Sequence, residues 1–181
     1  MLEIKVPAGE QWDEARQVFV YTEECTLQLE HSLVSLSKWE SKWHKPFNTR
    51  DRKTPEETID YVRCMTLTPK VDPSVYSCLT NENIDAINKY IEDPMTATRF
   101  SKDVNNGKTS SEQITAELIY YWMISFQIPF ECQYWHLNRL LTLIKVCNIK
   151  NQPPKKMGKR ELMSRNAALN AARRKQYNTR G

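Results

Sequence analysis

The sequence predicts an α+β protein that is mainly helical, with a small N-terminal antiparallel β element, then a helical bundle and a basic C-terminal helix. Three observations predict this fold class. Short segments rich in β-branched and aromatic residues precede residue 30. Apolar residues recur at helical spacing from there to about residue 150, and the last segment is rich in alanine and basic residues. We therefore expect a globular domain at 1–150 (β element 1–29, helical part 30–150) and a helical arm at 151–181.

The composition is typical of a soluble globular protein. The chain has 181 residues, of which 40% are apolar and 27% are charged. Its four glycines argue against a glycine-rich-loop enzyme and against a turn-rich all-β fold. The first residues lack the basic-then-apolar order of a signal peptide, and no segment reaches the ~20 apolar residues of a membrane span. We therefore expect a cytoplasmic protein that does not enter a membrane.

Strand-like segments occupy the first part of the chain. Residues Leu2–Val6 alternate between apolar and polar, and a Pro-Ala-Gly run ends that segment. Residues 16–22 and Cys25–Leu29 are rich in β-branched and aromatic side chains. Glu23 and Glu24 lie between them and are predicted to form a hairpin turn. These segments predict a small antiparallel sheet or hairpin.

Residues 29–47 are predicted to form one helix that ends at Pro46. At ~100° per residue, its large apolar side chains fall within one ~120° stripe. These are Leu29, Leu33, Leu36, Trp39 and Trp43. Two interpretations of Trp39 and Trp43 remain open: the indoles pack against the domain's own helices, or they form part of a protein-binding surface.

Capping residues predict where the next helices begin. Thr54 can cap a helix with Pro55 in its first turn, and Glu57 completes a capping box. Asp72 opens a shorter segment in the same way, and Thr80 can cap a further helix that ends before a proline. The polar stretch that follows, 101–110, contains an Asn-Asn-Gly turn signal and is predicted to be an exposed loop.

Two strongly apolar helices are predicted after that loop. Ser110 and Gln113 form a capping box for the first, which is expected to run to about Phe126. A short corner leads to the second, at about 130–147, whose apolar residues surround much of the helix. Aromatic side chains crowd both helices, and too many are present for one packed face. We therefore predict that some reach a protein interface, with Trp122 and Trp135 as the candidates.

The C-terminal arm differs from the rest of the chain in charge. From residue 153 to the end there are nine basic residues and one acid, a net charge of +8, which leaves 17 basic and 21 acidic residues, or −4, for the remainder. The predicted basic surface consists of Lys155, Lys156, Lys159, Arg160, Arg165, Arg173, Arg174 and Lys175. Such an arm can bind an acidic partner protein, can bind nucleic acid by neutralising phosphates, or can be a solvated extension. Its few large apolar residues argue against membrane insertion.

No residue set predicts catalysis, a metal site or a cofactor. His31 and His44 lie about 140° apart around one predicted helix and cannot share a metal, and the five cysteines form no CxxC pair. We interpret the cysteines as free thiols, with a Cys–His nucleophile as the alternative that no local motif supports. Glu40, among apolar residues, could act as an acid or base, or it could pair with His44 one turn later. No nucleotide-binding motif is present.

The segment 110–148, SSEQITAELIYYWMISFQIPFECQYWHLNRLLTLIKVCN, resembles the core of tail assembly chaperones of long-tailed bacteriophages. Those proteins have a helix that ends in aromatic residues, a short corner, and a leucine-rich helix that begins near a tryptophan, here Trp135. The corner carries Pro129 where that family has glycine. Residues 27–47 and 148–181 also resemble stretches of proteins encoded among phage tail genes.

The resemblance implies a non-catalytic accessory protein of virion assembly in the host cytoplasm. Such chaperones hold the long helical tape measure protein in solution and assist assembly of the tail tube around it. The expected partners are therefore the tape measure protein or other tail proteins, with self-association as a further option. The alternatives are a structural virion component, such as a head–tail connector or tail protein, and a nucleic-acid-binding protein that acts through its arm.

Overall fold

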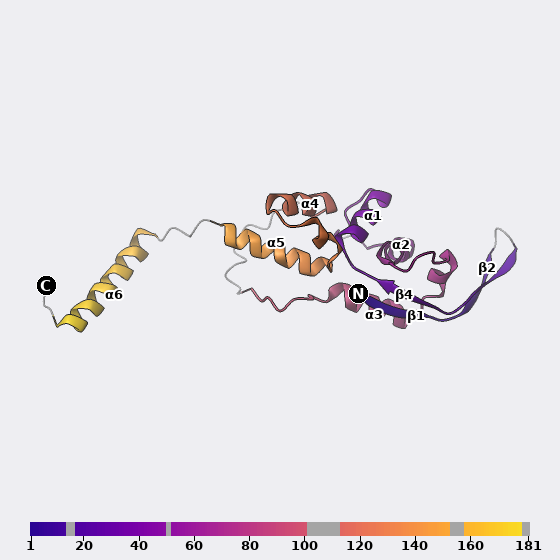
Figure 1. Ribbon diagram of the computed structural model, residues 1–181, viewed down its shortest axis with the longest axis horizontal. Helices are drawn as coiled ribbons and strands as arrows, with labels where there is room; N and C mark the ends of the chain where they lie inside the picture. Colours follow the sequence, from indigo (N-terminus) through magenta and orange to yellow (C-terminus); the bar gives the residue numbers. More distant parts are fainter. Residues whose placement is uncertain (14–16, 50–51, 101–112, 153–157, 179–181) are drawn as a thin grey trace. The chain divides into compact units, whose positions relative to one another are not determined.

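The computed structural model describes residues 1–13, 17–49, 52–100, 113–152 and 158–178. The chain divides into two compact units, Met1–Asn148 and Ile149–Gly181. The first unit has an N-terminal β element followed by helices, which confirms the predicted α+β, mainly helical class (Figure 1). Its strands are β1 (Leu2–Val6), β2 (Gly9–Asp13), β3 (Val18–Thr22) and β4 (Cys25–Leu29). Its α-helices are α1 (Leu33–Trp43), α2 (Pro55–Met65), α3 (Asn81–Glu92), α4 (Ala116–Ser125) and α5 (Leu137–Asn151, whose last turn belongs to the second unit). The described residues also form the 3₁₀ helices η1 (Pro73–Cys78) and η3 (Phe130–Tyr134), and the second unit contains α6 (Lys159–Tyr177).

The four strands form two consecutive antiparallel pairs. β1 pairs with β4, with Ile4 opposite Leu27 and Val6 opposite Cys25, and β2 pairs with β3 beyond them. Residues 23 and 24 therefore join two strands that are not paired with each other, so the predicted turn at Glu23 and Glu24 is wrong. The alternation of apolar residues in β1 and β4 places one face of this pair in the core.

The helix predicted for 29–47 begins four residues later than expected. Leu29 is the last residue of β4, opposite Leu2, and Ser32 caps α1 by accepting a hydrogen bond from the backbone N–H of Ser35. The hydroxyl of Ser35 accepts one in return from the N–H of Ser32. This reciprocal cap satisfies free backbone groups at the helix start, and strand pairing holds the residues before it.

The caps predicted for the middle helices are present. Thr54 and Glu57 form the capping box of α2, with Pro55 as its first residue. Asp72 caps η1 and Thr80 caps α3. Each cap satisfies backbone N–H groups that have no partner within the helix.

The two apolar helices differ from their predicted bounds. Thr115 caps α4, and the residues from Gln113 to Thr115 are not helical, so the capping box predicted at Gln113 is wrong. Ser110 and the predicted loop 101–110 lie outside the described residues. The second helix is divided: η3 covers 130–134, and α5 begins at Leu137 after an extended Trp135.

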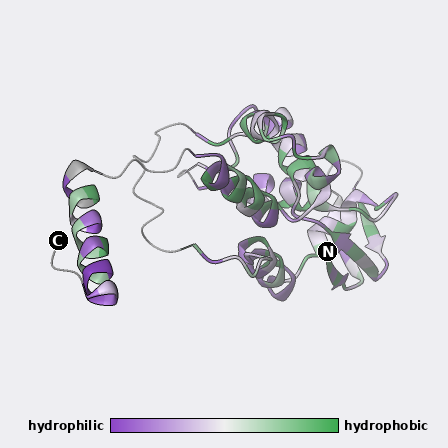
Figure 2. Cartoon of the chain, turned by 60° about the vertical axis from the view of Figure 1, so that its left-hand side comes forward, coloured by the Kyte–Doolittle hydropathy of each residue, from purple (hydrophilic) through white to green (hydrophobic). Residues whose placement is uncertain are grey.

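The first unit has two hydrophobic clusters that meet at α1. One cluster joins β1, β4, α2, η1 and α3 around Trp39. The other joins α1, through Leu33 and Leu36, to α4, η3 and α5. Phe47 packs against both. Figure 2 shows hydrophobic residues on the helices of this unit, and hydrophilic and hydrophobic residues mixed along α6.

Candidate functional site

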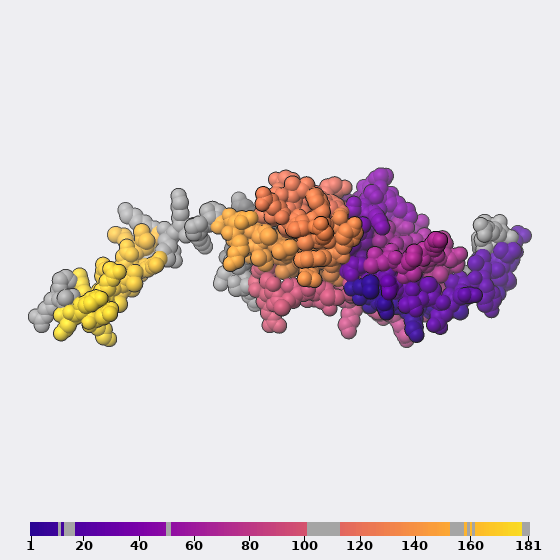
Figure 3. Space-filling view, in the orientation of Figure 1, coloured from indigo at the N-terminus to yellow at the C-terminus, as the bar shows by residue number. Residues whose placement is uncertain are grey.

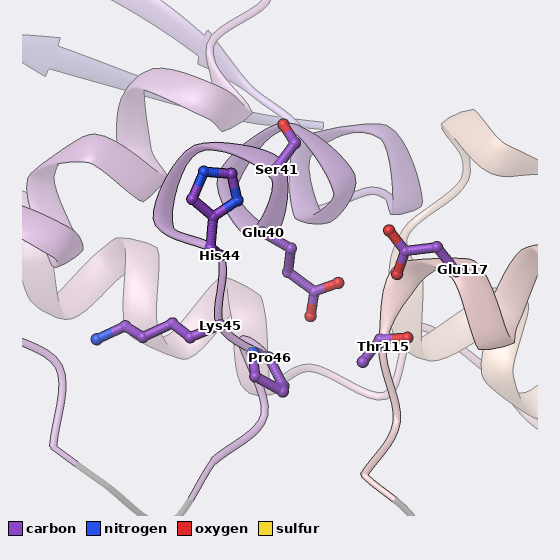
Figure 4. Close-up of a pocket in the computed structure, with 7 residues that line it drawn as sticks. All are labelled: Glu40, Ser41, His44, Lys45, Pro46, Thr115 and Glu117. Carbon is purple, nitrogen blue, oxygen red and sulfur yellow. The ribbon is translucent and has the colours of Figure 1, made fainter.

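A surface pocket of about 350 Å³ lies where the end of α1 meets the start of α4 (Figure 4). Its lining residues include Glu40, Ser41, His44 and Glu117. These residue types could in principle act in acid–base or nucleophilic chemistry. Figure 4 shows Ser41 and Lys45 pointing away from the carboxylate of Glu40.

The hydrogen bonds of this pocket are structural. Glu40 is 7% exposed, and its two oxygens accept hydrogen bonds from the backbone N–H of Phe47 at 2.8 Å and of Ala116 at 2.7 Å. Ser41 donates to the carbonyl of Lys38. The carboxylate therefore holds the start of α4 against the turn after α1, where a helix N-terminus favours negative charge. The alternative pairing of Glu40 with His44 is not found, since among the described residues no ion pair or hydrogen bond joins these two side chains.

A second polar cluster is buried between the two hydrophobic clusters. The rings of His31 and His136 lie with centroids 5.1 Å apart, and the side chains are 3% and 6% exposed. His31 Nδ1 lies 2.5 Å from the hydroxyl of Tyr61, and His136 Nε2 lies 2.9 Å from the backbone carbonyl of Tyr90. Burial, and then the nearby His136, lowers the pKa of His31 to about 3.

This histidine cluster connects four elements without forming a metal site. The backbone N–H of Leu137 donates to the carbonyl of His31 at 2.7 Å, so the start of α5 is joined to the segment before α1. The hydroxyl of Tyr90 donates to Glu30 at 2.8 Å. Among the described residues, no group of three His, Cys, Asp or Glu side chains could hold a metal. The sequence did not predict the contact between His31 and His136, because a contact between residues 105 positions apart leaves no local signal.

Trp39 and Trp43 face the domain's own elements. Trp39 has no exposed surface, and its Nε1 donates to the carbonyl of Glu57 at 2.9 Å. Trp43 is half-buried and its Nε1 donates to Asp60 at 3.0 Å. The first of the two open interpretations therefore applies to Trp39, which is a core residue.

Trp122 and Trp135 are both half-buried, on different elements. Trp122 lines an apolar groove of about 410 Å³ between α4 and α5, together with Phe126, Leu141 and Ile144. Trp135 follows η3, and the guanidinium of Arg139 lies 4.2 Å from its ring centroid. Further large apolar side chains are exposed on α4 and η3: Tyr121, Ile124, Phe130 and Tyr134. The segment 114–148 therefore carries both an apolar groove and exposed apolar side chains.

A second exposed apolar surface lies on the β2–β3 ribbon, which sequence reasoning did not single out. Trp12 and Phe19 are opposite each other and their rings make an edge-to-face contact at 4.9 Å. Trp12, Phe19 and Tyr21 are 51%, 64% and 77% exposed. Figures 1 and 3 show the ribbon extending beyond β1 and β4. The aromatic residues of these strands were visible in the sequence. The sequence does not show, however, which face of the strands is left uncovered by the rest of the protein.

The predicted basic surface lies partly on α6. Arg160, Arg165, Arg173, Arg174 and Lys175 are exposed on this helix. Lys159 is the first residue of α6. Lys155 and Lys156 lie outside the described residues. Arg174 and Lys175 lie in the last turn, where cations stabilise the helix dipole.

Comparison with protein-family models, with curated proteins and with solved structures gives no match for this chain. In the described part of the chain, no helix has both the length and the apolar character needed to cross a membrane.

Proposed function

We propose that this protein is a non-catalytic tail assembly chaperone of a long-tailed bacteriophage, which binds the tape measure protein in the host cytoplasm. The observation that supports this proposal best is the apolar groove between α4 and α5. It lies within the segment that resembles the chaperone family. A groove of this kind accepts the apolar face of an amphipathic helix, and the tape measure protein is a long helical client.

The polar clusters support a binding role rather than a catalytic one. Glu40 accepts two backbone hydrogen bonds, and His31 is buried against Tyr61. Each of these groups holds elements of the first unit together. The exposed apolar side chains of α4 and η3 instead offer surface that a partner can cover.

Co-expression with the tape measure protein encoded beside this chain tests the proposal. The client should stay soluble with the wild-type chain and aggregate without it. Phe126→Ser, which places a hydroxyl in the groove, should reduce the soluble fraction. Leu67→Ala is the matched control, because Leu67 is 55% exposed and lies outside the groove. A client that is equally soluble without this chain would contradict the proposal.

A structural virion component is the first alternative. Mass spectrometry of purified particles separates the two roles. A chaperone should be absent from mature particles, whereas a head–tail connector or tail protein should be present in stoichiometric amount.

Nucleic-acid binding is the second candidate, and the exposed cations of α6 favour it. Deleting residues 153–181 should then abolish binding to DNA or RNA. Binding by the wild-type chain should weaken steeply as salt rises, because phosphate neutralisation releases counterions. Unchanged affinity after the deletion excludes this function.

A further inference from the structure

The β2–β3 ribbon combines exposed aromatic rings with carboxylates. The register places Glu10 opposite Tyr21 and Trp12 opposite Phe19, so these four side chains share one face of the ribbon. Glu10, and Glu23 and Glu24 just after the ribbon, are exposed. From Gly9 to Glu24 the sequence has five acidic residues and one basic residue. One carboxylate, Glu10, therefore lies on the aromatic face, and two more follow the ribbon at Glu23 and Glu24. We call these six side chains, from Glu10, Trp12, Phe19, Tyr21, Glu23 and Glu24, the acidic aromatic surface.

Among the described residues, the ribbon contacts the rest of the first unit at its base. Its base contacts η1, where the hydroxyl of Thr22 donates to Ser74 at 2.9 Å. Beyond that contact the ribbon is a two-stranded sheet, which is marginally stable in water without a packed face. Edge strands and an exposed aromatic face are both features that a binding partner covers.

The chemistry of this surface specifies a basic partner. Cations are attracted to carboxylates and to the faces of Trp, Tyr and Phe rings. The chain contains such a partner, since α6 ends with Arg173, Arg174 and Lys175 in succession, followed by an exposed Tyr177. The net charges of −4 for the residues before 153 and +8 for the residues after 152 are complementary.

We propose that the acidic aromatic surface of the β2–β3 ribbon binds the basic α6 helix of a second copy of this chain. In the first unit, the ribbon and the part of α5 that ends this unit at Asn148 lie at opposite ends (Figures 1 and 3). The arm is therefore attached to the first unit at the end away from the ribbon, which favours the ribbon of another copy as its target. Such a contact joins two different surfaces, so it can link successive copies head to tail.

Two charge-reversal variants test the contact in the full-length chain. The arm variant carries Arg173→Glu, Arg174→Glu and Lys175→Glu, and the ribbon variant carries Glu10→Lys, Glu23→Lys and Glu24→Lys. All six positions are exposed, so circular dichroism should show an unchanged fold. The control variant reverses three other exposed cations and has the same net charge as the arm variant: Lys38→Glu, Lys70→Glu and Lys89→Glu.

Sedimentation velocity measures the expected self-association. At about 0.1 M salt the wild type should form concentration-dependent oligomers, and at about 1 M salt it should be monomeric, because the Debye length falls from ~10 to ~3 Å. The arm variant and the ribbon variant should each self-associate about tenfold or more weakly than wild type. The control variant should associate as wild type does.

Mixing the two variants distinguishes contact between copies from contact within one chain. The ribbon variant keeps a native arm and the arm variant keeps a native ribbon, and their two reversed surfaces also complement each other. Their equimolar mixture should therefore associate more strongly than either variant does alone. A chain with all six reversals should recover self-association. A monomeric wild type at low salt overturns the proposal, whether or not the arm binds its own unit. Variants that associate as wild type does, or a mixture that stays monomeric, also overturn it.

Discussion

At the residue scale, Trp39 and Trp12 have the same side chain in opposite environments. Trp39 is fully buried and hydrogen-bonded to the carbonyl of Glu57, whereas Trp12 is 51% exposed. Trp39→Ala should lower the free energy of unfolding by about 3–5 kcal/mol, because it removes a large core side chain and leaves a cavity. Trp12→Ala should lower it by no more than about 1.5 kcal/mol. Urea denaturation followed by circular dichroism measures both.

The difference between the two substitutions should be easy to measure, because the free energy of unfolding of a protein is only ~5–15 kcal/mol. Equal effects of the two substitutions would contradict the assignment of Trp39 to the core. They would also show that the β2–β3 ribbon is packed in solution.

His31 should make stability depend on pH. In the folded chain, burial holds its pKa at about 3, while in the unfolded chain it is ~6.5. Below ~6.5 the unfolded state therefore binds more protons than the folded state. The free energy of unfolding should fall as pH decreases from ~6.5 toward 3, by at most about 1.4 kcal/mol per pH unit.

Urea unfolding at pH 7.5, 6.0 and 5.0 tests this dependence. His31→Gln has no proton-binding ring and should reduce the loss of stability between these values. The matched control is His44→Gln, because His44 is exposed. It should keep the wild-type loss. Identical pH profiles for wild type and His31→Gln would refute the role of His31.

At the element scale, the local sequence specifies where several helices begin. The starts of α2, η1 and α3 were predicted, because a cap is chosen by side chains within four residues of the helix start. Ser32 is also a cap, but it was not predicted, because the helical spacing of Leu29, Leu33 and Leu36 placed the start of the helix before it. Pairing of β4 with β1 decides that Leu29 belongs to a strand, and that pairing involves residues more than twenty positions away.

The contact between the β2–β3 ribbon and η1 depends on a small residue at position 9. A Cβ atom on Gly9 would lie 2.6 Å from Cys78 Sγ and 3.5 Å from its Cβ. Gly9→Ala should therefore lower the free energy of unfolding by about 1 kcal/mol or more, because the thiol must move. In the double variant with Cys78→Ala, only the ordinary 3.5 Å contact remains.

A double-mutant cycle measures this coupling by urea unfolding. The loss caused by Gly9→Ala should be smaller in the Cys78→Ala background than in the wild-type background. Additive effects of the two substitutions would contradict a direct contact between the ribbon and η1.

At the scale of the whole molecule, the two units divide the chain into a packed part and a charged helix. The core clusters lie within residues 1–148. Deleting 153–181 should therefore shift the melting temperature of the first unit by no more than a few degrees, as measured by calorimetry at about 1 M salt. A large fall in melting temperature would show that the arm packs on the first unit.

The same division explains which parts of the candidate sites were predictable. Charge counting was sufficient to identify the basic arm. The histidine pair and the exposed ribbon depend on packing between distant segments, as the contact of His31 with His136 shows. Aromatic content predicts that some rings lie at an interface, but only their burial in the folded chain separates Trp39 from Trp12.

Val6 and Cys25 are paired at the point where the chain enters and leaves the ribbon, so the ribbon is an insertion between two neighbouring residues. A two-residue turn such as Asn-Gly could join these neighbours directly, because such a turn connects paired antiparallel strands. The loop between them can then change in length or composition while the register of β1 and β4 stays the same. A change of this loop would alter the contact that we propose between copies and leave the paired residues of β1 and β4 unchanged, and an engineer could graft a different hairpin at the same point.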